Sequence, residues 1–163
     1  MDRPDAREFL ETIAFLAQTP QHVITLIGGV SGENTRIRPA DNTFSAVEQA
    51  CHLRDIEQEG YLWRAKRMLA EDNPLLDDLD GAKLARERDY QSQDLAHALR
   101  AFASARHATL ALLLNATPEQ RARRGRFGDT KEITLVELAA MMHTHDSEHL
   151  VELEALHKML AAA

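Results

Sequence analysis

Hydrophobic residues recur at steps of three and four along four long stretches of the chain, with charged residues between them. This spacing brings the apolar side chains onto one face of a helix, and the other face stays polar. The pattern predicts long amphipathic helices over residues 5–17, 45–71, 91–114 and 134–163. Between them we expect connections at residues 30–42 and 72–89.

Two of these helices have well-marked starts. Each start has the spacing of a capping box, in which two residues three positions apart each use a side chain to satisfy the free backbone amide of the other. The two pairs are Ser45 with Glu48 and Thr134 with Glu137. Asn73-Pro74 is expected to end the second long helix, because proline cannot continue the backbone ladder.

Shorter elements are also expected. Thr19-Pro20 resembles a cap followed by a first-turn proline, which predicts a break and a short second helix ending at Gly28-Gly29. A helical turn is expected after Thr117-Pro118, and then a basic loop. No segment has convincing strand alternation, and the apolar run at residues 23–27 is too isolated to build a sheet.

Four amphipathic helices that cannot bury their apolar faces separately predict an all-α four-helix bundle. With 163 residues, the chain has room for one domain, residues 1–163, with a sizeable core. Hydrophobic residues make up 44% of the chain and charged residues 28%, which is ordinary for a soluble globular protein.

The charge pattern bears on partners and location. A net charge of −7 argues against binding to nucleic acid and to anionic membranes. No run approaches the ~20 apolar residues that span a bilayer, and the polar N-terminus lacks the apolar part of a signal peptide. The single cysteine, Cys51, excludes an internal disulfide and fits a reducing compartment, so the cytoplasm is expected.

His145 and His149 occupy positions where the last helix should carry leucine or isoleucine. They lie four residues apart on the apolar stripe that includes Leu138 and Leu156. Buried neutral imidazoles need polar partners, and two at this spacing can share a divalent metal ion. The pattern therefore predicts inward-facing metal chemistry.

His52 is the best candidate for a third ligand. It lies eleven residues before Trp63, close to three full helical turns, and so shares a line with residues expected in the core. Three imidazoles suit Zn²⁺, Ni²⁺ or Fe²⁺ and leave a coordination position open for water or substrate. Carboxylates available to orient the ligands are Glu48, Asp55 and Glu148.

Other candidate residues have plainer interpretations. His143 lies about 200° around the helix from His145 and is expected at the surface, and Cys51 is expected to be a small buried residue. The basic loop is either solvated or able to hold a substrate carboxylate or phosphate. Its arginines are Arg121, Arg123, Arg124 and Arg126.

Two stretches resemble the DinB-like superfamily of metal-binding four-helix bundles. Residues 38–57 are similar to the family's proline-containing lead, helix start and first metal histidine, and residues 133–150 to its H-x-x-x-H helix. The resemblance implies a metal triad of His52, His145 and His149. Phe44 departs from the tryptophan that the family commonly has before the serine.

The resemblance also implies classes of function. Some members are transferases that depend on a low-molecular-weight thiol, which a metal would bind as thiolate, and hydrolysis by metal-activated water is a variant of the same chemistry. The alternative is a non-catalytic metal-binding or stress-response protein. A homodimer with a small-molecule substrate is expected. DNA binding ranks last, because the net charge opposes it and no recognition motif is present.

Overall fold

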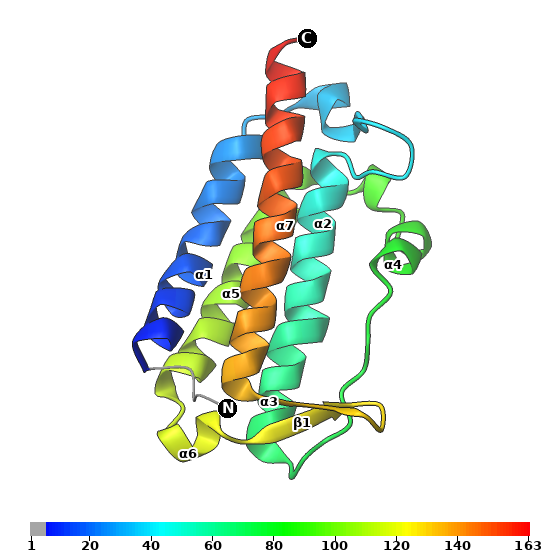
Figure 1. Cartoon of the computed structure of the whole chain (residues 1–163). Helices are drawn as coiled ribbons and strands as arrows, with labels where there is room; N and C mark the ends of the chain where they lie inside the picture. The colour runs from blue at the N-terminus through cyan, green and yellow to red at the C-terminus, as the bar shows by residue number, and fades with distance from the viewer. Residues whose placement is uncertain (1–5) are drawn as a thin grey trace.

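A computed structural model describes residues 6–163, and four long helical rods run side by side in it (Figure 1). The rods are α1 (Ala6–Ile27), α2 (Ala46–Asp55) continued through η2 (Ile56–Tyr61) and α3 (Leu62–Ala70), α5 (Leu95–Asn115), and α7 (Leu135–Ala161). Their inward faces form the hydrophobic core. The predicted four-helix bundle is confirmed. No helix among residues 6–163 is long and apolar enough to cross a membrane.

The helix starts follow the caps visible in the sequence. Both capping boxes form: the Ser45 side chain accepts from the Glu48 amide, and the Thr134 side chain accepts from the Glu137 amide. α5 begins at Leu95, four residues later than expected. Asp94 caps it, because its carboxylate accepts a hydrogen bond from the His97 amide at 2.7 Å.

The second rod contains a turn of π-helix, residues Ile56–Tyr61, which the sequence pattern did not predict. A π-turn takes up more residues than an α-turn, so every residue after it is rotated relative to a regular helix. Tyr61 is therefore buried, and Trp63, expected in the core, is 50% exposed. The alignment of His52 with Trp63 was wrong, although His52 does face inward.

α1 is continuous through Pro20, so the expected break at Thr19-Pro20 is also wrong. Proline has no N–H to donate, and the carbonyl oxygen of Leu16 is left without its helical partner. Arg106 of α5 donates to this oxygen from Nη1 at 3.0 Å. A contact from another helix thus satisfies the group that the proline frees.

Arg106 is the centre of a buried ion-pair network. Its guanidinium is 2% exposed and donates to both carboxylate oxygens of Asp146, at 2.7 and 2.9 Å, and to Glu57 Oε2 at 2.9 Å. With Leu16, these contacts join α1, η2, α5 and α7 at one level of the bundle. Burial lowers the pKa of Arg106, but the two carboxylates outweigh it, and the net pKa is raised.

The connections contain more structure than expected. The segment expected at residues 30–42 includes a 3₁₀ turn, η1 (Gly32–Arg36), and the one at 72–89 includes α4 (Gly81–Glu87). A second 3₁₀ turn, η3 (Tyr90–Ser92), precedes α5, and α6 (Pro118–Arg121) forms after Thr117 as predicted. Figure 1 shows α4 on the outer side of α2.

The basic segment before α7 is a β-hairpin, not a loop. β1 (Arg124–Phe127) pairs antiparallel with β2 (Lys131–Thr134), and Leu75 adds a parallel bridge to Arg126. The strands have four residues each and bury few side chains, so they lack a sequence signal strong enough to recognise. The hairpin leads directly into the Thr134 cap of α7.

Candidate metal centre

Three imidazoles meet between α2 and α7. Nε2 of His52 lies 3.2 Å from Nε2 of His145 and 3.1 Å from Nε2 of His149. One ligand atom from each of the three residues falls within 4.8 Å of the others. The two α7 histidines are four residues apart and therefore share a face, and α2 supplies the third ring.

The separation of these nitrogens suits a metal ion. Zinc binds imidazole nitrogen at about 2.0–2.1 Å, and tetrahedral coordination then places two ligand nitrogens about 3.3 Å apart. The observed 3.1 and 3.2 Å are close to this value. The rings already converge as three ligands would, and a fourth position would be available to water or substrate.

The histidines are held in the neutral form that a metal requires. Burial, and after it the neighbouring imidazoles of His149 and His145, lower the pKa of His52 to about 3. Burial, His149 and the charges of Arg106 and Arg64 likewise lower the pKa of His145 to about 3. Burial also lowers the pKa of His149. A neutral imidazole keeps a lone pair free for coordination.

Two residues that the sequence did not single out orient His149. Its Nδ1 lies 2.9 Å from Gln49 Oε1 and 3.3 Å from Glu152 Oε2. Gln49 in turn donates from Nε2 to Glu152 Oε2 at 2.7 Å, which fixes its amide. Gln49 lies three positions before His52 on α2, and Glu152 lies three positions after His149 on α7. This spacing puts each residue on the same helix face as a site histidine, and it is the sequence signal that could have identified them.

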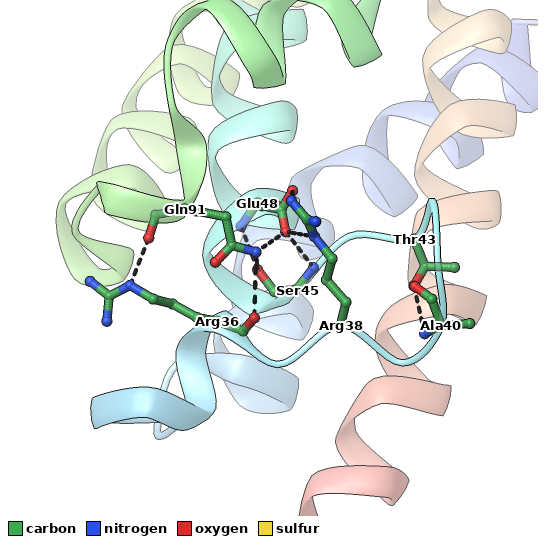
Figure 2. Close-up of polar contacts among 7 residues, drawn as sticks. All are labelled: Arg36, Arg38, Ala40, Thr43, Ser45, Glu48 and Gln91. Atoms are coloured by element: carbon green, nitrogen blue, oxygen red, sulfur yellow. Dashed lines mark hydrogen bonds and ion pairs between the residues drawn. The ribbon is translucent and has the colours of Figure 1, made fainter.

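The carboxylates expected around the ligands lie elsewhere. Glu48 is buried beneath the connection from α1 and accepts from Arg38 at 2.7 and 3.0 Å, from Ser45 and from Gln91 (Figure 2). Asp55 is held by Arg54, Arg88 and Tyr90, and Glu148 is exposed. Among residues 6–163, none of these three carboxylates hydrogen-bonds to a site imidazole.

The basic segment belongs to α6, β1 and the residues between them, and Figure 1 shows α6 and β1 at the lower end of the bundle. Arg123 donates to the carbonyl oxygens of Met68 and Glu71 at the end of α3, Arg121 lies over the Phe9 ring, and Arg124 pairs with Glu132. The backbone of Arg126 pairs with the segment at Pro74–Leu76. His145 lies ten residues into α7, about 15 Å from this end. The structure does not bring this segment to the histidines.

Comparisons with known proteins agree with the fold and show the family. A model of the DinB superfamily matches residues 16–153, most of the chain. The chain belongs to the DinB superfamily. It is also similar in structure to YfiT from Bacillus subtilis, described as a probable metal-dependent hydrolase with an unusual four-helix bundle topology. The TM-score is 0.89 at 19% identity, over 99% of this chain and 92% of YfiT. The search of curated proteins found no match.

Two other candidates in this DinB-superfamily chain lie outside the site. His143 is half-buried rather than exposed, because its ring packs on Phe15 at 4.0 Å between centroids. Cys51 is buried, its thiol lies 3.5 Å from Gln93 Oε1, and burial raises its pKa to about 11. A thiol in this environment is a packing group and not a nucleophile.

Gly81, at the start of α4, lies against the imidazole of His52 and leaves no room for a side chain there. A Cβ at this position would lie 2.7 Å from Cε1 and 2.9 Å from Nδ1 of the imidazole. Either the ring or the start of α4 would have to shift, and a shifted ring would no longer be held in its present place beside His145 and His149. We therefore expect Gly81→Ala to keep the fold and to weaken Zn²⁺ binding about tenfold or more, in line with the effect of disturbed ligand orientation.

Gly29→Ala is the matched control for this substitution, because a Cβ at Gly29 meets nothing within 4 Å. Isothermal titration of both variants with Zn²⁺, together with their melting temperatures, makes the comparison. Equal affinity in Gly81→Ala and Gly29→Ala would show that α4 does not position His52.

Proposed function

We propose that His52, His145 and His149 bind a divalent transition metal ion, and that the site catalyses metal-dependent hydrolysis of a small molecule. The convergence of three neutral imidazole nitrogens is the observation that carries the proposal. The set of donors suits Zn²⁺, Ni²⁺ or Fe²⁺. The likeness to YfiT supports hydrolysis over other reactions at such a site.

The residues around the ligands have definable tasks. Gln49 and Glu152 hold the His149 ring by Nδ1, so its Nε2 faces the other two histidines. Gly81 confines His52 from outside. A metal bound by three imidazoles would supply an acidified water at neutral pH. The same open position could instead take a low-molecular-weight thiol as thiolate, which makes thiol-dependent transfer the variant to test beside hydrolysis.

Metal content tests the binding step. We expect protein purified without a nickel column to carry close to one equivalent of transition metal by elemental analysis. His52→Ala should weaken Zn²⁺ affinity at least about 100-fold, because loss of a ligand costs more than the 10–100-fold typical of its outer partners. His143→Ala, which changes a histidine on α7 that packs on Phe15, should retain the metal. Retention of metal by His52→Ala would refute the triad.

Turnover tests the catalytic step. Metal-loaded protein, chelated protein and His52→Ala would be compared on a panel of esters, amides and lactones, and then with thiols and electrophiles. Activity that requires both metal and His52 would support hydrolysis or transfer, according to the substrate class. Tight metal binding without turnover on either panel, with a large loss of stability on chelation, would support the non-catalytic alternative.

A further inference from the structure

Arg64 is a buried cation without a matching anion. Its side chain is 7% exposed, and the only carboxylate within 4.0 Å among the described residues is that of Asp78, at 4.0 Å and 96% exposed. Nε and Nη2 donate to the carbonyl oxygen of Asp77, at 3.3 and 2.7 Å. Nη1 makes no hydrogen bond within residues 6–163 and is not one of the buried unpartnered side-chain atoms, so solvent reaches it. Burying most of a cation with only so distant a carboxylate beside it is costly.

Arg106 provides the comparison within the same protein. It is even more deeply buried, but two carboxylates neutralise it at hydrogen-bond distance, and its pKa is raised. For Arg64, burial lowers the pKa, because Tyr61, Asp78 and Asp77 compensate too little. Arg106 thus has two buried carboxylates as counter-ions, whereas Arg64 has only the exposed Asp78 carboxylate at 4.0 Å.

Arg64 is separated from His145 by the Tyr61 ring, and its guanidinium also packs over Phe127, at 5.0 Å from that ring centroid. Its guanidinium is 5.6 Å from the centroid of the Tyr61 ring, and that ring packs edge-on against His145 at 5.8 Å between centroids. The charge of Arg64 contributes to the lowered pKa of His145. The Tyr61 hydroxyl makes no hydrogen bond within residues 6–163, although the residue is 5% exposed. Tyr61 therefore packs on one ligand, and Arg64 packs on Tyr61.

The π-turn brings these two residues to the site. The extra residue in the π-turn rotates all the residues that follow it around the helix axis. In a regular α-helix, Tyr61 and Arg64 would therefore face a different direction. The same rotation leaves Trp63 exposed. π-turns inside α-helices occur frequently at functional sites. Here the irregular turn is followed by a phenol ring that packs against His145 and by a guanidinium that packs against that phenol ring.

We propose that Arg64, assisted by the Tyr61 hydroxyl, binds a carboxylate of the substrate whose reacting group occupies the open position of the metal. This inference rests on the proposed function and adds a substrate class: small molecules with a carboxylate remote from the reacting bond. Guanidinium is suited to carboxylate, because its planar N–H groups match the two oxygens. A bound carboxylate would supply the counter-ion that Arg64 lacks.

Co²⁺-loaded protein offers a readout that does not need turnover. Acetate, succinate, glutarate and adipate would be titrated while the visible Co²⁺ absorption is followed. Each can place one carboxylate on the metal, but only the dicarboxylates can also reach Arg64. We expect one dicarboxylate to bind at least about tenfold more tightly than acetate, the value of a charged hydrogen bond.

Arg64→Gln should abolish this preference and leave acetate affinity nearly unchanged. Tyr61→Phe should reduce the preference while keeping the ring, the metal and the melting temperature, because the hydroxyl has no bond to lose. Arg100→Gln removes the same charge from an exposed position on α5 and should behave as wild type.

The possible failures are distinguishable. Absence of Co²⁺ binding would refute the proposed metal site and with it this inference. Metal binding with no dicarboxylate preference in the wild type, or with a preference that survives Arg64→Gln, would refute the inference alone. Loss of stability in Arg64→Gln with an intact preference would show that Arg64 only anchors the segment at Asp77.

Discussion

Asp146→Ala is expected to lower the free energy of unfolding by about 3–5 kcal/mol, the cost of removing one partner from a buried ion pair. Asp146 is fully buried and accepts two hydrogen bonds from Arg106, at 2.7 and 2.9 Å. Removing it leaves the Arg106 guanidinium with Glu57 as its only carboxylate. Urea unfolding of metal-stripped protein measures the loss without a contribution from metal binding.

Glu87→Ala is the control, because Glu87 forms an exposed pair with Lys83 at 3.8 Å. An exposed pair contributes about 0–1 kcal/mol, so this variant should unfold close to the wild type. A loss in Asp146→Ala no larger than in Glu87→Ala would mean that the Arg106 network is not a source of stability.

The features of the fold that depend on residues close together in the sequence were predicted. The capping boxes at Ser45 and Thr134 depend on residues three positions apart, and they mark the true starts of α2 and α7. The i, i+4 spacing of His145 and His149 likewise fixes their shared face. His52 could be assigned because its own helix places it inward, before the π-turn changes the register.

The parts that depend on distant residues were not predicted. Pro20 is tolerated inside α1 because the Leu16 carbonyl accepts a hydrogen bond from Arg106, which is 90 positions from Leu16 in the sequence. Gly81 matters because α4 lies on His52, a contact that no spacing within a helix encodes. Gln49 and Glu152 could be placed by helical periodicity, but only the packing of α2 on α7 shows that they share His149.

The stability of the metal-stripped protein should fall by about 4 kcal/mol between pH 7.5 and pH 5, because of His52 and His145 alone. Their pKa is lowered to about 3 in the folded chain, against an ordinary value of 6.5. Well above pH 6.5 both states are neutral and no stability is lost. Below it the unfolded chain binds protons that the folded chain refuses, so acid favours unfolding, by about 2 kcal/mol per histidine at pH 5.

Substitution of one histidine separates this effect from general acid sensitivity. His52→Gln removes one proton-binding group from the unfolded chain and should reduce the loss between pH 7.5 and pH 5 by about 2 kcal/mol. His143→Gln changes a histidine on α7 that packs on Phe15, outside the cluster, and should keep the full loss. Urea unfolding at both pH values supplies the numbers. An equal loss of stability in His52→Gln and the wild type would mean that the pKa of His52 is not lowered by folding. The fold would then not keep this imidazole neutral for metal binding.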